Sequence, residues 1–330
     1  AGTLVFAILT IADKYSSRLV FLICSLAGAL CTLAALLQVE SFSALLFWRA
    51  CTGFFLAGIY PVGMKIAAQW FPKGLGVALG WLVGALVLGS ASAHGIRAVS
   101  SELPWSMVML SVAGLAAMGG LMLYGLVPEP VHKPAQAKQL QWQALATIWT
   151  DRRVRASVLG YFGHMWELYT LWVLVPLILA TRFEGTQLSM AAFAVIGVGA
   201  VGCILGGFAA QRWGSAWVAT TQLSISGLCC LLAPWLMSAP LGWMLAWLIL
   251  WGITVAGDSP QFSTLTASNA PPQAVGSVLT LTNCIGFGIS IVSIELFTSL
   301  SATNALSALL PWLSIGPLLG IWAMRSLLKN

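Results

Sequence analysis

Long apolar runs, separated by short polar turns, recur along the whole chain. About 20 apolar residues in an α-helix, rising ~1.5 Å each, cross the ~30 Å of hydrocarbon in a bilayer. Ten complete runs of this kind lie at 19–38, 42–69, 74–97, 104–126, 155–181, 186–210, 215–237, 241–267, 277–299 and 304–325. The first stretch, 1–12, would reach only about 18 Å at that rise, so we expect it to be the second half of a spanning helix.

One long polar segment interrupts this pattern near the middle of the chain, at residues 127–154, and it contains three prolines. Polar stretches rich in proline commonly join structured parts of a chain. We therefore predict an N-terminal half at 1–126 (a partial second helix to the sixth), a cytoplasmic linker at 127–154, and a C-terminal half at 155–330 (helices seven to twelve).

A sparse repeat relates the two halves. When the sequence is shifted by 199 residues without gaps, Ala57 meets Ala256, Gly58 meets Gly257, Pro61 meets Pro260, Ala68 meets Ala267, Pro72 meets Pro271 and Gly89 meets Gly288. Duplicated units with a site between them are typical of transporters. In this register the segment 1–12 is the second helix of its half. We therefore expect the first helix and the start of the second to be missing from this chain, and the full protein to have twelve spans.

The composition supports a membrane protein. Hydrophobic residues make up 59% of the chain and charged residues only 7%, whereas about 25% of a soluble domain is charged. The 16 Trp residues fit this reading, because Trp gathers at membrane interfaces. None of the seven Cys residues has the spacing of a zinc or haem site, so we expect no metal and no cofactor.

The net charge of +6 reflects topology rather than a nucleic-acid partner. With the turn at Asp13 to Arg18 in the cytoplasm, twelve of the 15 Lys and Arg residues fall on that side. Arg97 and Arg182 fall on the other side, and Arg49 lies within a span. This is the positive-inside pattern. We expect a monomeric, multi-pass protein of the cell's inner or plasma membrane, with the lipid bilayer and a small solute as its partners.

Motifs in both halves resemble the major facilitator superfamily. The loop residues Asp13, Lys14 and Arg18 are similar to the family's signature after the second helix, and residues 207–214 are similar to its copy in the second half. Arg49, with the glycines that follow it, resembles the fourth-helix pattern. The resemblance implies an all-α integral membrane protein with two pseudo-symmetric six-helix halves. It also implies solute transport by alternating access.

Within the family, the stretches 60–65 and 259–263 are similar to the ends of the fourth and tenth helices in nitrate/nitrite-type and related members. The chain departs from the usual signatures at Leu9, in place of Gly, and at Gln211, in place of Asp. The fifth-helix run from Gly80 lacks the Gly-Pro pair of drug/proton antiporters, which disfavours an antiporter. The Gly- and Asn-rich signature of true nitrate porters is not found either, so the solute stays open.

Ionisable residues inside a membrane are costly and therefore candidates for function. Arg49 lies about 10 Å deep in its helix, by the helical rise, without an acidic neighbour one turn away. Tyr60, eleven residues on, should return to the same face. Arg49 could bind an anionic solute or take part in proton coupling, or it could be a structural Arg that bonds to neighbouring helices.

A second candidate set lies on the span 155–181, where Tyr161, His164 and Glu167 follow at three-residue steps and form a polar stripe. A His–Glu pair away from water could exchange a proton near neutral pH. The alternative is a buried, hydrogen-bonded pair that only holds this helix in place.

A third set lies in the tenth helix and its neighbour. Asp258 shares a face with Gln261, and Pro260 frees a backbone carbonyl nearby. Asn283 could line the same pathway from the eleventh helix. Interrupted helices at matching positions in two halves indicate a binding site or a gate, and Pro61 with Pro260 forms such a pair. The alternative for Asp258 is capping, or pairing with a cytoplasmic Lys or Arg.

Charges in the cytoplasmic loops are candidates for gating. Asp13, Lys14, Arg18 and Arg212 could pair with a facing helix end in one state and release it in another. Together with the hinges Pro61 and Pro260, they form our predicted gating set.

Three function classes remain in view. The favoured one is a secondary transporter of a small solute, with an anion and proton coupling preferred because of Arg49 and Glu167. A transporter of an organic cation or drug-like solute would use Glu167 and Asp258 as counter-charges, and a sensor would keep the fold without transport. A membrane enzyme is disfavoured, because the chain has only three His residues and no HExxH or GxSxG motif.

Overall fold

A computed structural model describes residues 2–9, 11–99, 104–128, 142–272 and 274–328. Every regular element within these ranges is a helix. The elements are α1 (Gly2–Ile8), α2 (Ile11–Lys14), α3 (Ser17–Leu37), α4 (Phe42–Leu56), α5 (Tyr60–Trp70), α6 (Leu75–Val99), α7 (Trp105–Leu126), α8 (Trp142–Thr150), α9 (Arg152–Leu179), α10 (Gly185–Gly197), α11 (Gly199–Trp213), α12 (Ser215–Leu236), α13 (Leu241–Gly257), α14 (Ser259–Asn269), α15 (Val275–Ser301), α16 (Leu306–Leu309), η1 (Leu310–Ser314) and α17 (Ile315–Met324).

Ten stretches of helix in the described residues are long and apolar enough to cross a membrane, and they coincide with the ten predicted runs. The differences are a few residues at the ends; for example, the run at 155–181 is helical over Arg152–Leu179. The predicted linker holds the short helix α8, and its residues 129–141 lie outside the described ranges.

The chain forms two compact units. Unit 1 comprises Ala1–Pro72, Glu102–Ile148 and Ala270–Cys284, and unit 2 comprises Lys73–Ser101, Trp149–Asn269 and Ile285–Asn330. Helix α6 belongs to unit 2, where it packs against α10 and α11. The units therefore do not follow the order of the chain, and the division into halves at 1–126 and 155–330 stays a prediction.

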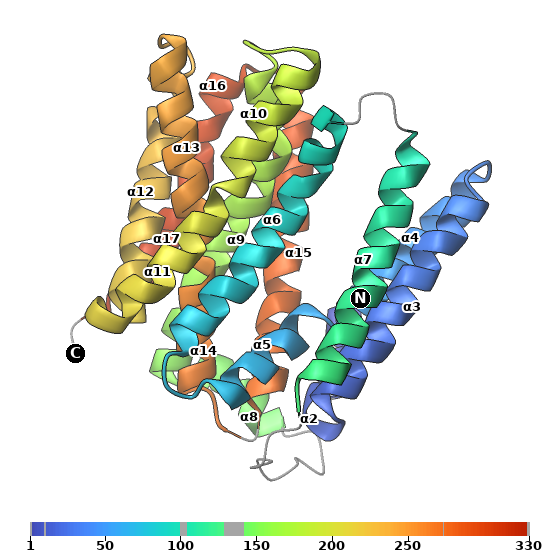
Figure 1. The fold of residues 1–330 in the computed structure, drawn as a ribbon. Coiled ribbons are helices and arrows are strands. Elements are labelled where there is room, and N and C mark those ends of the chain that lie inside the picture. The colour runs from blue at the N-terminus through green and yellow to red at the C-terminus, as the bar shows by residue number, and fades with distance from the viewer. Residues whose placement is uncertain (1, 10, 100–103, 129–141, 273, 329–330) are drawn as a thin grey trace. The chain divides into compact units, whose positions relative to one another are not determined.

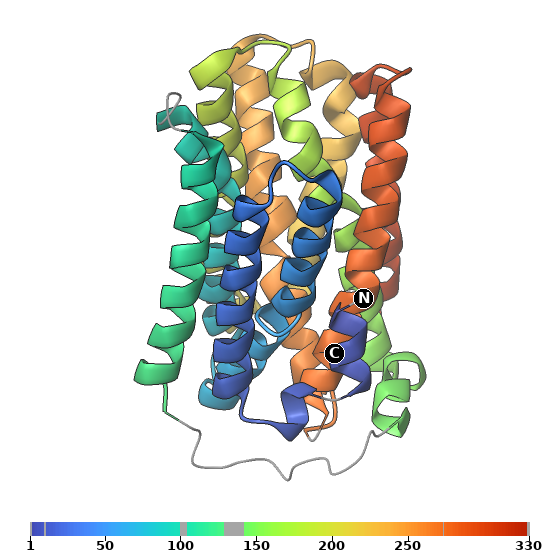
Figure 2. The ribbon, with the colours of Figure 1, turned by 90° about the vertical axis from the view of Figure 1, so that its right-hand side faces the viewer.

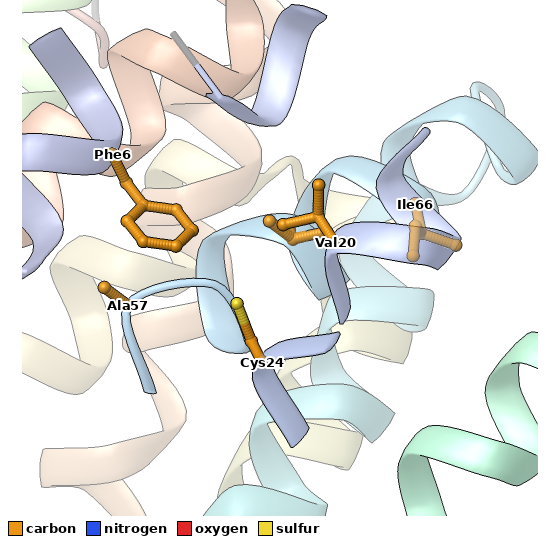
Figure 3. Close-up of a cluster of buried hydrophobic side chains, with 6 residues drawn as sticks. Phe6, Val20, Cys24, Ala57 and Ile66 are labelled. Atoms are coloured by element: carbon orange, nitrogen blue, oxygen red, sulfur yellow. The ribbon is translucent and has the colours of Figure 1, made fainter. Parts of the chain in front are cut away.

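In unit 1, helices α3, α4 and α7 lie side by side (Figure 1), and α3 and α4 form an antiparallel hairpin (Figure 2). The buried cluster in Figure 3 joins α1, α3 and α5 to the end of α4 through Phe6, Val20, Cys24, Ala57 and Ile66, together with Val62. A β-carbon at Gly58 would lie 2.8 Å from the Phe6 ring, so the chain can pass this cluster only without a side chain there.

In unit 2, glycines bring helix backbones together. Gly163 of α9 meets Gly316 of α17, and a β-carbon on Gly163 would also lie 3.0 Å from Cα of Gly320. Gly80 of α6 faces α11, where a β-carbon would lie 2.6 Å from the carbonyl oxygen of Cys203. Small residues at such crossings allow the close approach on which packing between membrane helices depends.

Three of the ten spans each consist of two α-helices, and a fourth, Leu306–Met324, passes through the 3-10 helix η1. The span Phe42–Trp70 breaks between α4 and α5, and Leu241–Asn269 breaks at Asp258 between α13 and α14. Pro61 and Pro260 are the second residues of α5 and α14. In the first turn of a helix the backbone N–H groups have no acceptor within the helix, so proline, which lacks an N–H, is tolerated there. The third break lies between α10 and α11 and contains no proline, so sequence reasoning did not find it.

Candidate functional site

The interior of unit 2 holds a buried pair of ionisable side chains, His164 on α9 and Asp258 between α13 and α14. Nδ1 of His164 and Oδ1 of Asp258 lie 2.7 Å apart, and both side chains are 0% exposed. The distance is that of an ion pair, although the angles do not meet hydrogen-bond geometry. The position of the proton decides whether this pair is charged. One interpretation of the sequence was that Asp258 pairs with a cytoplasmic Lys or Arg. In the structure its neighbour is His164, which lies within a membrane span.

The local sequence explains why Asp258 stands in this position. Pro260 has no N–H to continue the ladder of α13. The chain restarts as α14, where the carbonyl oxygen of Asp258 accepts from the N–H groups of Gln261 at 3.0 Å and Phe262 at 3.1 Å. The break therefore sets a carboxyl group, rather than an apolar helix surface, against α9.

Glu167 lies one turn from His164 on α9 and has different partners. Its carboxylate accepts from Nε1 of Trp251 at 2.6 Å, from Oγ of Ser226 at 3.0 Å and from Sγ of Cys230 at 3.3 Å. These donors belong to α12 and α13, so one carboxylate joins three helices. The predicted His164–Glu167 pair is not formed. Sequence spacing found both residues, but it could not show that each faces another helix.

Polar atoms without a hydrogen-bond partner in the described chain lie beside the buried pair. They are Nε2 of His164, Oδ2 of Asp258 and, one turn after Asp258, both side-chain amide atoms of Gln261, a residue that is also 0% exposed and whose Oε1 faces Gly76 of α6. The ring of His164 lies near those of Tyr161 and Phe262, at centroid distances of 5.7 Å and 6.0 Å. The predicted residues Tyr161, His164, Asp258 and Gln261 thus gather in one buried, partly unsatisfied polar centre.

Hydroxyl groups of α15 tie that helix to α9. Oγ of Ser290 donates to the carbonyl oxygen of Met165 at 2.7 Å, and Oγ of Ser293 donates to that of Trp166 at the same distance. Asn283, the predicted pathway residue of α15, is buried and belongs to unit 1.

Arg49 lies in unit 1 at a cavity of about 290 Å³ lined by α3, α4 and α7. Its side chain is exposed, and we find no hydrogen bond or ion pair to it from the described residues. Hydroxyl groups of Ser25, Thr32 and Thr52 share the cavity wall. The spacing predicted that Tyr60 would lie on the same helix face as Arg49. The two residues lie on different helices instead, because α4 ends at Leu56 and α5 begins at Tyr60.

The predicted gating residues are dispersed. The guanidinium of Arg18 donates to the carbonyl oxygen of Tyr124 and lies 4.9 Å from the centroid of its ring, which joins the start of α3 to the end of α7. Lys14 ends α2, and Arg212 is exposed in the last turn of α11. The side chain of Asp13 lies outside what the structure describes. In the described part of the chain, no group of three or more His, Cys, Asp and Glu residues could hold a metal ion.

The sequence matches the family model described as Major Facilitator Superfamily over residues 1–294. The chain belongs to the major facilitator superfamily. The predicted family and fold class are thereby confirmed, while the nitrate/nitrite branch stays a prediction. No curated protein sequence matches the chain.

Two solved transporters are similar in fold to this superfamily member. The human organic anion transporter MFSD10 (TETRAN) has a TM-score of 0.78 and 18% identity, with 98% of this chain and 81% of that chain covered. A bacterial homologue of the iron transporter ferroportin, in its outward-facing state, has a TM-score of 0.75 and 14% identity, with 100% and 88% covered. Family and fold support membrane transport by a multi-pass protein, and they point to a transporter rather than an enzyme.

Proposed function

We propose that this protein is a secondary transporter that moves a small organic anion by alternating access, coupled to protons. The observation that carries the proposal is the buried polar centre of unit 2. Ionisable residues in a membrane span mark solute pathways and proton relays, because burying them otherwise only costs stability. His164 and Asp258 face each other at an interrupted helix, the kind of place where transporter sites are built.

Arg49 favours an anion as the solute. It carries a fixed positive charge, it has no ionic partner among the described residues, and it stands in a cavity with hydroxyl groups. A guanidinium in this setting suits a carboxylate, which it can bind through two parallel N–H donors. The fold neighbour MFSD10 is named as an organic anion transporter, which agrees with this choice but does not carry it, since the identity is 18%.

Glu167 is the proposed proton carrier. Trp251, Ser226 and Cys230 are all neutral donors, so no Lys or Arg fixes the charge of this carboxyl group. Gaining a proton would weaken the bonds that join α9 to α12 and α13, because a carboxylate accepts more strongly than a carboxyl group. Protonation would thereby be linked to the packing of the helices around the buried pair.

Uptake by the purified protein in liposomes tests the solute class. The probes are radiolabelled mono- and dicarboxylates, sulfonates and phosphate esters, with tetraethylammonium as the cation. We expect accumulation of at least one anion, lost in Arg49→Gln and retained in Arg97→Gln, which removes an exposed Arg elsewhere. Uptake of the cation alone would support the organic-cation alternative. A folded protein that moves no probe would favour a sensor that has kept the fold.

A further inference from the structure

A cavity of about 590 Å³ in unit 2 lies outside the proposed transport pathway, where α11 ends and α12 begins. Figure 1 shows the junction of these two helices. Gly214 connects the two helices as a single residue with φ 81° and ψ 148°. Only glycine adopts this backbone conformation readily. The tight turn holds Arg212 and Trp213 of one helix near Trp217 of the next, and all three line the cavity.

The chemistry of the wall is that of a membrane interface. Trp213 and Trp217 are 60% and 55% exposed, and we find no hydrogen bond from either indole N–H among the described residues. Trp side chains at the headgroup level place an apolar ring toward the lipid tails and an N–H donor toward the glycerol and phosphate. Ala209 and Val218 continue the wall as an apolar surface.

Arg212 gives the cavity a net positive charge, since its lining includes no Asp or Glu. The guanidinium lies 5.7 Å from the centroid of the Trp213 ring and has no ion-pair partner among the described residues. The positive-inside pattern places this end of α11 on the cytoplasmic side, where anionic lipid headgroups are attracted to basic residues.

We propose that this cavity binds the headgroup of an anionic glycerophospholipid from the cytoplasmic leaflet. The phosphodiester binds Arg212, the glycerol region faces Trp213 and Trp217, and the start of an acyl chain lies along Ala209 and Val218. A lipid with a net charge of about −1, such as phosphatidylglycerol, fits better than a zwitterionic one. The wall offers no acid for a choline or ethanolamine group. This inference does not depend on the proposed solute.

Native mass spectrometry of the purified protein with added phosphatidylglycerol or phosphatidylcholine tests the site. We expect phosphatidylglycerol to bind in preference. Arg212→Gln should weaken that binding about fivefold, since one basic residue near the surface contributes about 1 kcal/mol, and Arg212→Lys should restore part of it. The matched control is Arg325→Gln. Arg325 is also exposed and lies 4.6 Å from the Trp322 ring centroid, but it does not line this cavity.

Three outcomes would overturn the proposal. The first is equal binding of phosphatidylglycerol by wild type and Arg212→Gln. The second is an equal loss of binding in Arg325→Gln, which would show that the lipid responds to the net positive charge and not to this cavity. The third is binding of free glycerol phosphate that excludes phosphatidylglycerol, which would assign the cavity to a soluble phosphate. Because Arg212 is exposed and at a helix end, its replacement should leave the fold intact, and a melting curve for each variant checks this.

Discussion

The indole N–H of Trp251 donates to Oε1 of Glu167 across 2.6 Å, between two side chains that are both 0% exposed. This bond links α13 to α9 two helical turns before the break at Asp258. Trp251→Phe removes the N–H donor together with the five-membered ring of the indole, a truncation that the control variant below shares. We expect the free energy of unfolding in detergent to fall by about 1–3 kcal/mol, the usual cost of leaving a buried acceptor without its donor.

The control for this prediction is Trp247→Phe. Trp247 lies beside Trp251 with ring centroids 5.2 Å apart, but its N–H donates to the backbone carbonyl of Cys229 instead of a carboxylate. A smaller loss of stability is expected there, because bonds to charged groups are stronger than neutral ones. If Trp251→Phe melts like the wild type, the bond to Glu167 does not hold α13 to α9.

The His164–Asp258 pair makes a second prediction. Replacing one partner leaves the other buried without its counterpart, which typically costs about 3–5 kcal/mol. Asp258→Asn and His164→Asn should each destabilise strongly. The double variant should lose less unfolding free energy than the two single variants lose together, because the interaction between the pair is lost only once. Additive effects in chemical unfolding would show that the two side chains do not interact.

The third prediction concerns the crossing of α9 with α17. Gly163→Ala places a β-carbon against the backbone of Gly316 and Gly320, so the helices must separate. Overpacking of this kind costs about 1–3 kcal/mol, and the melting temperature should fall. In Gly89→Ala, where the added carbon meets nothing within 4 Å, the melting temperature should stay the same or rise. If the two variants have the same melting temperature, the close crossing of α9 and α17 does not determine stability.

The fourth prediction concerns the turn at Gly214. An added side chain would meet nothing within 4 Å there, so Gly214→Ala tests the backbone alone. Alanine at φ 81° should cost about 1–3 kcal/mol. Gly242→Ala is the control, because Gly242 has an equally open site and no positive φ. A wild-type melting temperature for Gly214→Ala would mean that the turn relaxes freely.

Much of the fold could be predicted because the bilayer imposes a simple rule on the sequence. Runs such as 74–97 and 215–237 must be apolar over the whole hydrocarbon thickness, and the structure has helices at Leu75–Val99 and Ser215–Leu236. Breaks marked by Pro61 and Pro260 could also be predicted, since proline removes a helical donor. The break before Gly199 carries no such mark in the sequence.

The candidate site could be predicted only in part. Charge in an apolar helix identified His164, Glu167 and Asp258 as individuals. Their partners could not be read from spacing, because Trp251, Ser226 and Cys230 come from helices far away in sequence. Trp and Ser in membrane helices are ordinary, and only the packing shows which of them donate to a buried carboxylate. Periodicity likewise failed to relate Arg49 to Tyr60, since it assumes an unbroken helix.

Proton movement driven by the solute tests the central claim most directly. Liposomes that contain the purified protein and a trapped pH-sensitive dye are mixed with the anion that the uptake screen identifies. Coupled entry should acidify the interior with wild type, and Glu167→Gln should reduce the acidification at least tenfold while remaining folded and inserted. Uptake of the anion by wild type at the same rate with and without a pH gradient, and with no acidification, would contradict the account.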